Sequence, residues 1–505
     1  CPFRPYKNTF EADNLYLRNI ISIKDMKKVT LVMLALTAVM QLPAQEQGRT
    51  LSLEEALEMT LSDNPAIRAA EFNRRAAQQE RRAAIGLRMP QIGITGSYAY
   101  LGKDIEIDLN NMKAPVQNLA GQILQSGMIP SDYIPSISQM LSGAMAASWA
   151  LPLQDRSLGF VGGDVTVPLW MGGKINAANR AARINEQTAR SQGIQQRNAL
   201  VSELVERYYG LALARQVVVV RQQVVDGVRK HLEDAAALEA QGMISRSEKL
   251  YVEFKMSEAE RDLQNAQSQV ETIAAALNST IGQTDDYQPV TAMFILERIE
   301  PLDHFRTLAA ERNPLLDQVD QKRRLAYEGV RAQRSSFLPQ VVAMGGMSFY
   351  DYQVSKVLPR WAVGVGVNFK LFDGLNREYK YSAAKQTVRR VEALQDKAGN
   401  DISVLVEKLY NQMENYRTQM ASIEASLAFA EEYLKTKNAA FLEGMSSSTD
   451  LIDAELNLAK VKTERIEAAY RYDVSLAQLL EAAGISDEFT AYMRRQDARR
   501  ITFEK

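Results

Sequence analysis

An internal duplication limits the possible folds of this chain more than any other feature of its sequence. Four short motifs recur in the same order in the two halves: residues 64–65 and 313–314 (NP), 90–91 and 339–340 (PQ), 169–172 and 371–374 (LWMG and LFDG), and 242–243 and 444–445 (GM). The spacing between matched motifs shortens by about 47 residues between the second and third pairs, so the first half carries an insertion of about that length. A fold built from two similar units is therefore expected.

Long tracts without proline occupy most of each half. Proline is absent from 169–288 and from 360 to the C-terminus, and a proline inside a helix costs roughly 3 kcal/mol. Within 402–434, apolar residues recur in steps of three and four, which is the pattern of a helix packed along another helix. The sequence predicts mainly α structure with one long and two shorter helices per half: 174–241 with 66–89 and 246–281, and 376–440 with 315–338 and 448–483. Because the two shorter helices together match the long one in length, we expect them to stack into a rod antiparallel to it.

Four segments between these helices change to a period of two residues. Apolar residues alternate with small or polar ones in 361–371 and in 91–100, and less regularly in 160–169 and 340–350. One apolar, aromatic-ended face on strands of about ten residues is typical of a membrane β-barrel wall, although a half-buried sheet in a soluble sandwich gives a similar pattern. Four strands are too few to enclose a lumen, and an open sheet edge cannot lie in lipid. A barrel would therefore require several copies of the chain.

The N-terminal residues 1–44 are typical of a processed segment. Two lysines follow Met26, then an apolar run, then Ala44 as the expected cleavage point of a secretory signal peptide. That run is shorter than the roughly 20 residues that span a bilayer. We expect an exported protein that lacks this segment, and the export signal favours the barrel over the sandwich. Cys1, the single cysteine, lies in it, so no disulfide, thiolate metal site or lipid-bearing cysteine at the cleavage point is expected.

Composition and charge point away from several function classes. A net charge of −1 gives no broad basic surface for nucleic acid. The two histidines, His231 and His304, have no partners at metal-ligand spacing, so no metal or other cofactor is expected. The GVG stretch at 364–366 lies in a predicted strand and lacks the third glycine and the helix of a dinucleotide-binding loop. We therefore do not expect enzyme activity.

The duplicated order of NP, PQ, a strand pair, a glycine-ended long helix and a GMxSxx[ED] turn resembles the TolC family of outer-membrane efflux proteins. The resemblance covers residues 51–484, and the order and spacing of the motifs are more specific than any motif alone. It implies a homotrimer, with a twelve-stranded barrel in the outer membrane that continues into the periplasm as an α-helical tunnel. The implied role is a passive exit duct for efflux or secretion, which works with a periplasmic adaptor and an inner-membrane pump.

The implied domain order follows the two repeats. Residues 45–281 form the first repeat and 313–484 the second, while 282–312 and the tail 485–505 form a band around the middle of the tunnel. The insertion, at 101–158, would face the cell exterior. It would form either a lid over or in the channel mouth or a loose surface loop, and its length predicts some local structure.

Two turns follow the glycines that end the long helices, and both carry a helix-capping signal. The SxxE motif at 245–248 and the SxxD motif at 447–450 match a capping box, in which a hydroxyl and an acid bond free backbone N–H groups. The expected capping residues are Ser245, Glu248, Ser447 and Asp450. By the resemblance these turns are the periplasmic tips that contact the adaptor, and otherwise they are ordinary surface turns; the residues concerned are Gly242, Met243, Ser245, Gly444, Met445 and Ser447.

Capping does not explain Asp453, which lies one turn beyond Asp450 on the same helix face. The resemblance implies that both aspartates ring the closed periplasmic aperture, select cations and repel one another. The tyrosine and arginine that tie neighbouring helices shut in the family fall here on Phe441 and Ser446. Neither of these can make a charged link, so closure must depend on other contacts or on packing.

Aromatic residues near strand ends fit a membrane interface, and core packing explains them almost as well: Tyr98, Tyr100, Trp149, Trp170, Phe349 and Trp361. An alternative for the whole chain is a periplasmic adaptor or coiled-coil structural protein. An adaptor would carry one helical hairpin flanked by β-domains, whereas this sequence predicts two hairpins and two strand pairs. The pump that selects the transported substrate belongs to other chains.

Overall fold

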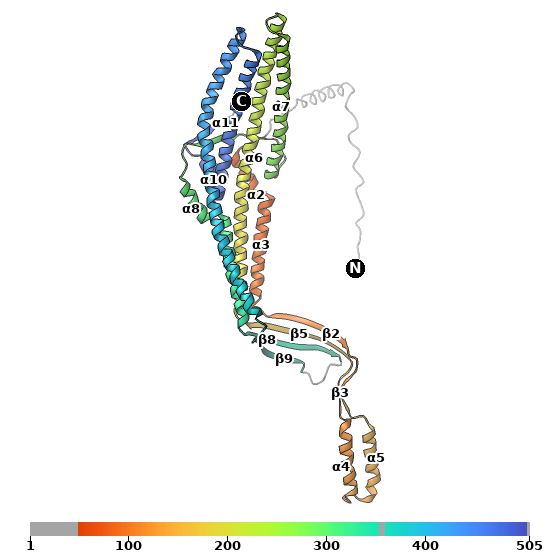
Figure 1. Ribbon diagram of the computed structural model, residues 1–505. Coiled ribbons are helices and arrows are strands. Elements are labelled where there is room, and N and C mark those ends of the chain that lie inside the picture. The colour runs from red at the N-terminus through yellow and green to blue at the C-terminus, as the bar shows by residue number, and fades with distance from the viewer. Residues whose placement is uncertain (1–48, 353–358, 502–505) are drawn as a thin grey trace, which may run out of the picture. The chain divides into compact units, whose positions relative to one another are not determined.

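The computed structural model describes residues 49–352 and 359–501 (Figure 1). The expected signal peptide and Cys1 lie outside these residues. The described residues divide into two units, one of residues 49–50 with 285–288 and one that contains the rest. β1 (Arg49–Leu51) pairs with β6 (Tyr287–Pro289), and the Arg49 guanidinium lies 3.5 Å from the Asp285 carboxylate.

Two long helices dominate the second unit, as the proline-free tracts predict. α6 (Lys174–Ala240) and α10 (Asn376–Leu442) each contain 67 residues. Two shorter helices pack along each of them (Figure 1): α3 (Pro65–Gly86) and α7 (Arg246–Ile281) along α6, and α9 (Pro314–Arg334) and α11 (Ser448–Ala482) along α10. Among the described residues, no helix is both long enough and apolar enough to cross a membrane.

The duplicated Asn-Pro motif joins the two shorter helices of each half. The side-chain oxygen of Asn64 accepts the backbone N–H two residues on, and its amide donates to the Thr280 carbonyl in α7 at 2.9 Å. Asn313 repeats this arrangement and donates to the Ala482 carbonyl in α11 at 2.8 Å. The proline that follows each asparagine occupies a first helical position, where no N–H is needed. Each asparagine therefore caps one short helix and holds the end of the other against it.

A buried core lies where α6 meets α11. Leu204 and Tyr208 of α6 and Leu476 of α11 have no exposed surface. Asp473 of α11 is also fully buried, and its carboxylate accepts the backbone N–H of Phe294 at 3.2 Å. Burial raises the pKa of Asp473 well above its usual value. This acid therefore helps to hold β7 (Met293–Leu296) against α11.

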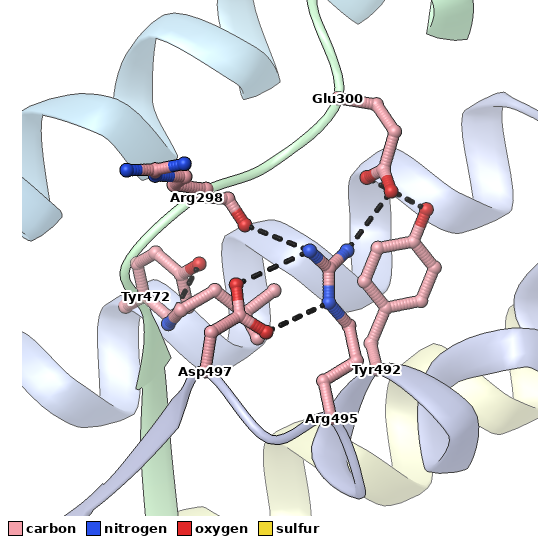
Figure 2. Close-up of polar contacts among 7 residues, drawn as sticks. Arg298, Glu300, Tyr472, Tyr492, Arg495 and Asp497 are labelled. Carbon is pink, nitrogen blue, oxygen red and sulfur yellow. Dashed lines mark hydrogen bonds and ion pairs between the residues drawn. The ribbon is translucent and has the colours of Figure 1, made fainter.

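The C-terminal segment is fixed to the linker between the repeats through Arg495 (Figure 2). Its guanidinium donates to both carboxylate oxygens of Asp497 at 3.0 and 3.2 Å, and to the Glu300 carboxylate at 2.9 Å. It also donates to the Arg298 carbonyl at 3.1 Å, while the Tyr492 hydroxyl donates to Glu300 at 3.2 Å. Two helices lie directly before the Asn-Pro motifs, α2 (Leu53–Asp63) and α8 (Leu302–Arg312). The C-terminal segment contains α12 (Phe489–Met493) and β10 (Ala498–Ile501), which pairs with β7.

Four antiparallel strands form one sheet in the order β2-β5-β8-β9: β2 (Gln91–Tyr100), β5 (Ser157–Trp170), β8 (Gln340–Tyr352) and β9 (Trp361–Asn368). The register aligns their apolar positions on one face, with Ile92 opposite Val165, Val165 opposite Gly345, and Gly345 opposite Val363. Ile92 is 78% exposed and Val363 is 77% exposed. The sheet thus presents a continuous apolar face to its surroundings.

The insertion at 101–158 folds as a small sheet that carries a helical hairpin (Figure 1). β3 (Ile105–Asp108) pairs with β4 (Ala150–Gln154), and between them lie α4 (Lys113–Gln125) and α5 (Ile134–Ala146). The segment therefore has the local structure that its length predicts, and it is not a loose loop.

Candidate functional site

The two helical hairpins end in turns with the same backbone geometry. Gly242 and Gly444 adopt φ angles of 71° and 74°, the left-handed region that glycine enters without strain. The N–H groups of Met243 and Met445 each donate to the carbonyl five residues back, at 2.9 and 2.8 Å. This pattern satisfies the carbonyl groups left free at a helix end. The predicted tip residues are all exposed: Gly242, Met243, Ser245, Gly444, Met445 and Ser447.

A serine begins the second helix of each hairpin. The Ser245 hydroxyl accepts the backbone N–H of Glu248 at 3.3 Å, and the Ser447 hydroxyl accepts that of Asp450 at 3.2 Å. In the second hairpin the pKa of Asp450 is lowered mainly by Lys437, with a smaller contribution from the backbone N–H of Ser447. Both serines thus make the N-cap bond that the capping signal predicts.

Asp450 is paired within its own hairpin. Lys437 of α10 places its ammonium 3.3 Å from the Asp450 carboxylate, and the Ser446 hydroxyl donates to the same oxygen at 3.2 Å. The hydrogen bond from Lys437 is the largest cause of the lowered pKa of Asp450. Ser446, which cannot make a charged link, therefore supports the acid directly, and Lys437 balances the charge of Asp450.

Asp453 lies one turn further along α11 and is exposed. Among the described residues, no hydrogen bond or ion pair joins its carboxylate. The Asp453 charge acts on Lys255 of α7 only weakly. The pKa of Lys255 is raised mainly by a hydrogen bond to Glu258, with a small contribution from Asp453. The two aspartates thus differ, because Asp450 is charge-paired and Asp453 is not.

Phe441 stands where the family resemblance places a residue that holds neighbouring helices closed, but it makes a different kind of contact. Its ring packs edge to face on His231 of α6, with centroids 4.4 Å apart and planes at 76°. Both side chains are buried, and neither imidazole nitrogen has a hydrogen-bond partner among the described residues. Burial lowers the pKa of His231, with a smaller opposing effect from Asp234. The two hairpins are therefore joined here by packing, without a charged link.

A second contact joins the hairpins two residues beyond Asp453. The Glu455 carboxyl of α11 fills the space beside Gly227 of α6, where a Cβ atom would overlap it. Burial raises the pKa of Glu455 to about 7. The only sequence signal for this pair is a glycine inside a long helix, which often marks a close approach.

Four of the predicted interface aromatics are exposed on the sheet near its end beside the insertion: Tyr98, Tyr100, Phe349 and Trp361. Trp170 is exposed at the opposite end of β5. Trp149 directly precedes β4, so it lies at a strand end as predicted, but in the insertion. Its indole N–H donates to the Ala144 carbonyl at 2.8 Å, within the hairpin of the insertion and outside the four-stranded sheet.

Among residues 49–352 and 359–501, no three His, Cys, Asp or Glu side chains lie close enough to hold a metal ion.

Residues 306–485 match the family described as outer membrane efflux protein. The match spans 180 of the 505 residues, so this part of the chain is similar to that family. It is 22% identical over 324 residues to the alkaline protease secretion protein AprF of Pseudomonas aeruginosa, a match covering 61% of this chain and 65% of that protein. It is 23% identical to the cobalt-zinc-cadmium resistance protein CzcC of Cupriavidus metallidurans over 75% of this chain and 85% of CzcC. It is 22% identical to the outer membrane protein TolC of Escherichia coli over 86% of this chain and 83% of TolC.

Solved structures of outer-membrane channels share this fold. The CmeC outer membrane channel of Campylobacter jejuni aligns with a TM-score of 0.67 and 14% identity, over 88% of this chain and 89% of that one. The outer-membrane channel OprN aligns with a TM-score of 0.68 and 15% identity, over 86% and 89% of the two chains. The predicted combination of long helices with a four-stranded sheet is thus the architecture of known channels.

Proposed function

We propose that three copies of this chain form an outer-membrane channel, which continues into the periplasm as a helical tunnel and serves as a passive exit duct for efflux or secretion. The four-stranded sheet is the observation that carries this proposal. It exposes a continuous apolar face, and β2 and β9 are its edge strands. Because an open edge in lipid leaves backbone groups unpaired, β9 of one copy would pair with β2 of the next and close a twelve-stranded barrel.

The chain resides in the outer membrane, like the efflux proteins that it matches, with its helices in the periplasm. The alternative of a periplasmic adaptor is not favoured, because the duplicated hairpins and the exposed apolar sheet have no place in a single-hairpin adaptor. The family consists of transport proteins, and we propose no catalytic role for this chain.

The helical tips are the proposed docking site for a periplasmic adaptor, which would link the duct to an inner-membrane pump. Their exposed glycines and serines allow close approach by another helical hairpin. AprF is named for protease secretion and CzcC for metal resistance. Because relatives with such different cargoes share this architecture, we propose that the pump and adaptor select the substrate.

The gate is proposed to lie at Asp450 and Asp453. In a trimer these would give two rings of carboxylates around the axis, which favour cations. The buried His231–Phe441 contact supports closure by packing, because it joins the two hairpins near the tips. The exposed sheet aromatics Tyr98 and Tyr100 are proposed to lie at the membrane interface.

Single-channel conductance in a planar bilayer tests this function. The wild-type protein should show a small cation-selective conductance, which rises and loses selectivity in a variant with Asp450→Ala and Asp453→Ala. Equal conductances in the two proteins would support the channel but contradict the proposed gate at the aspartates. If folded trimers showed no conductance, the proposal of a channel would be contradicted.

Fractionation and mass provide an independent check. Native mass spectrometry in detergent should find three copies per particle. Recovery of the protein from the periplasm as a soluble species without detergent would contradict the barrel.

A further inference from the structure

The hairpin of the insertion, α4 and α5, carries an apolar surface that a single copy leaves uncovered. The two helices contact one another, and each has partly buried apolar residues, among them Val116, Leu124 and Leu141. Both helices are fully described, and neither contains a buried residue. Leu119 is 59% exposed and Met140 is 77% exposed. Contact between α4 and α5 therefore accounts for only part of their apolar surface.

The exposed apolar residues form a second stripe on each helix at helical spacing. The α4 stripe begins at Met112, directly before the helix, and continues with Leu119 and Ile123. The α5 stripe begins at Tyr133, directly before that helix, and continues with Ile137 and Met140. At 3.6 residues per turn, each stripe lies about a quarter-turn from the α4–α5 contact. Apolar residues that recur every three or four positions are typical of a helix that packs on another helix. Each helix is thus patterned for two helical neighbours, and one copy supplies only one.

The low charge of the α4–α5 hairpin limits which partners could cover its apolar stripes. Between residues 109 and 149 the sequence has only two charged side chains, Lys113 and Asp132. A helix that lies on a membrane surface is typically rich in Lys and Arg on its polar face, whereas the polar faces here carry Gln, Asn and Ser. A strongly charged partner protein would likewise find no complementary charge. An identical uncharged hairpin fits this surface best.

The root of the hairpin places it beside the proposed contact between copies. It continues directly from β2, an edge strand of the sheet, and from β5. At the root, the Arg156 guanidinium lies 3.5 Å from the Asp104 carboxylate, and the backbone N–H of Leu101 donates to the Arg156 carbonyl at 2.5 Å. In the trimer, β9 of the next copy would pair with this same β2. The hairpin is therefore continuous with the surface that receives a neighbouring copy.

We propose that the hairpins of three copies pack on one another, α4 of one against α5 of the next, and form a six-helix closure on the outer side of the channel. The inference rests on the proposed trimeric channel. Its occupant is a second copy of this chain, bound through the stripes around Leu119 and Ile137. Opening this end would require the helices to separate, independently of the periplasmic tips.

Photo-crosslinking tests the packing. A benzophenone amino acid is placed at Leu119 or at Ile137, and its matched control at Asn118 or Gln139, which lie on the polar faces of the same helices. Because all four positions are on the surface of one copy, the replacements should not disturb folding. Illumination of the purified full-length protein in lipid vesicles should give dimers and trimers of the chain from Leu119 and Ile137. The controls should remain largely monomeric on a denaturing gel.

The outcomes separate this inference from the proposed function. Trimers by native mass spectrometry that crosslink only to lipid, or not at all, at Leu119 and Ile137 would overturn the packing and leave the channel. Crosslinks of equal yield at the control positions would also overturn it. If native mass spectrometry finds no trimer, the proposed channel fails first.

Conductance tests the closure. Leu119→Gln with Ile137→Gln should raise the open probability of a channel that retains Asp450 and Asp453, and Asn118→Ala with Gln139→Ala should leave it unchanged. Unchanged conductance in the first variant, despite crosslinking between copies, would show that the hairpins pack without closing the mouth and would overturn that part of the proposal.

Discussion

His231 and Phe441 pack edge to face between the two helical hairpins, with ring centroids 4.4 Å apart. His231 lies in α6 and Phe441 in the last turn of α10, and their side-chain exposures are only 3% and 4%. A neutral imidazole suits this apolar contact, whereas a protonated one would carry a buried charge without a partner. The contact that joins the hairpins near their tips is therefore sensitive to acid.

Acidification should loosen the tips through His231. Burial lowers the pKa of His231 below its usual value of about 6.5, so in the range just below 6.5 the unfolded segment binds more protons than the folded one. The stability contributed by neutral His231 is present above that range and is lost as the pH falls. Hydrogen exchange at the ends of α6 and α10 should accelerate at pH 5.5 relative to pH 7.5, after correction for intrinsic rates.

His231→Leu should remove this acceleration, since leucine fills the contact without titrating. His304, the other histidine, is exposed on α8, so His304→Leu provides the control and should behave like the wild-type protein. Equal acid sensitivity in the two variants would assign the effect to other groups.

Local sequence patterns predicted the elements of this fold well, because those elements depend on residues close together in the chain. The absence of proline predicted α6 and α10, and alternation predicted β9, although β9 ends at Asn368 and not at 371. The helices of the insertion were not predicted, since glycine, proline and serine interrupt their pattern. Both helices use proline only at or near the N-terminal turn, where it is tolerated.

Contacts between distant residues could not be read from the sequence. The Asn-Pro motifs were visible as markers of the repeat, but the bond from Asn64 to Thr280 depends on the stacking of two helices. Likewise, His231 had no visible partner because Phe441 lies in the other repeat. Asp450 was recognised as a capping residue, whereas Lys437, which balances its charge, was not.

Glu455 should affect the tips with the opposite sign to His231. Burial raises its pKa to about 7, and the pKa of an unfolded glutamate is about 4.3. The stability of the α6–α11 contact is therefore complete below about pH 4.3 and falls as the pH rises toward 7, by up to about 4 kcal/mol. Glu455→Gln should remove this loss, which urea unfolding at pH 5 and pH 8 would measure. A pH dependence that survives the substitution would contradict it.

Gly227→Ala should weaken the same contact sterically. A Cβ atom at this position would overlap the Glu455 carboxyl, and overpacking of this kind typically costs about 1–3 kcal/mol. A double-mutant cycle with Glu455→Ala provides the check, because shortening the acid should restore most of the lost stability. Additive effects of the two substitutions would mean that Gly227 is required for another reason.

The asparagines of the duplicated motif should contribute to stability in both repeats. Asn64→Ala or Asn313→Ala removes a helix cap and leaves the carbonyl of Thr280 or Ala482 without its donor, so each should cost about 1–3 kcal/mol in thermal or urea unfolding. Aspartate keeps the cap acceptor and loses the donor. Asn64→Asp should therefore be destabilising as well, and full stability in that variant would show that only the cap matters.

Asp453 should control ion selectivity more strongly than Asp450. Lys437 lies 3.3 Å from Asp450 and balances its charge, while no ion pair among the described residues joins Asp453. In reversal-potential measurements, Asp453→Asn should therefore reduce cation selectivity more than Asp450→Asn. Lys437→Met should increase it, because it leaves the charge of Asp450 unbalanced in every copy. Lys435→Met is the matched control, since Lys435 pairs with Glu432 on the same helix at 3.2 Å. A larger effect of Lys435→Met than of Lys437→Met would place the selective charges elsewhere on the hairpin.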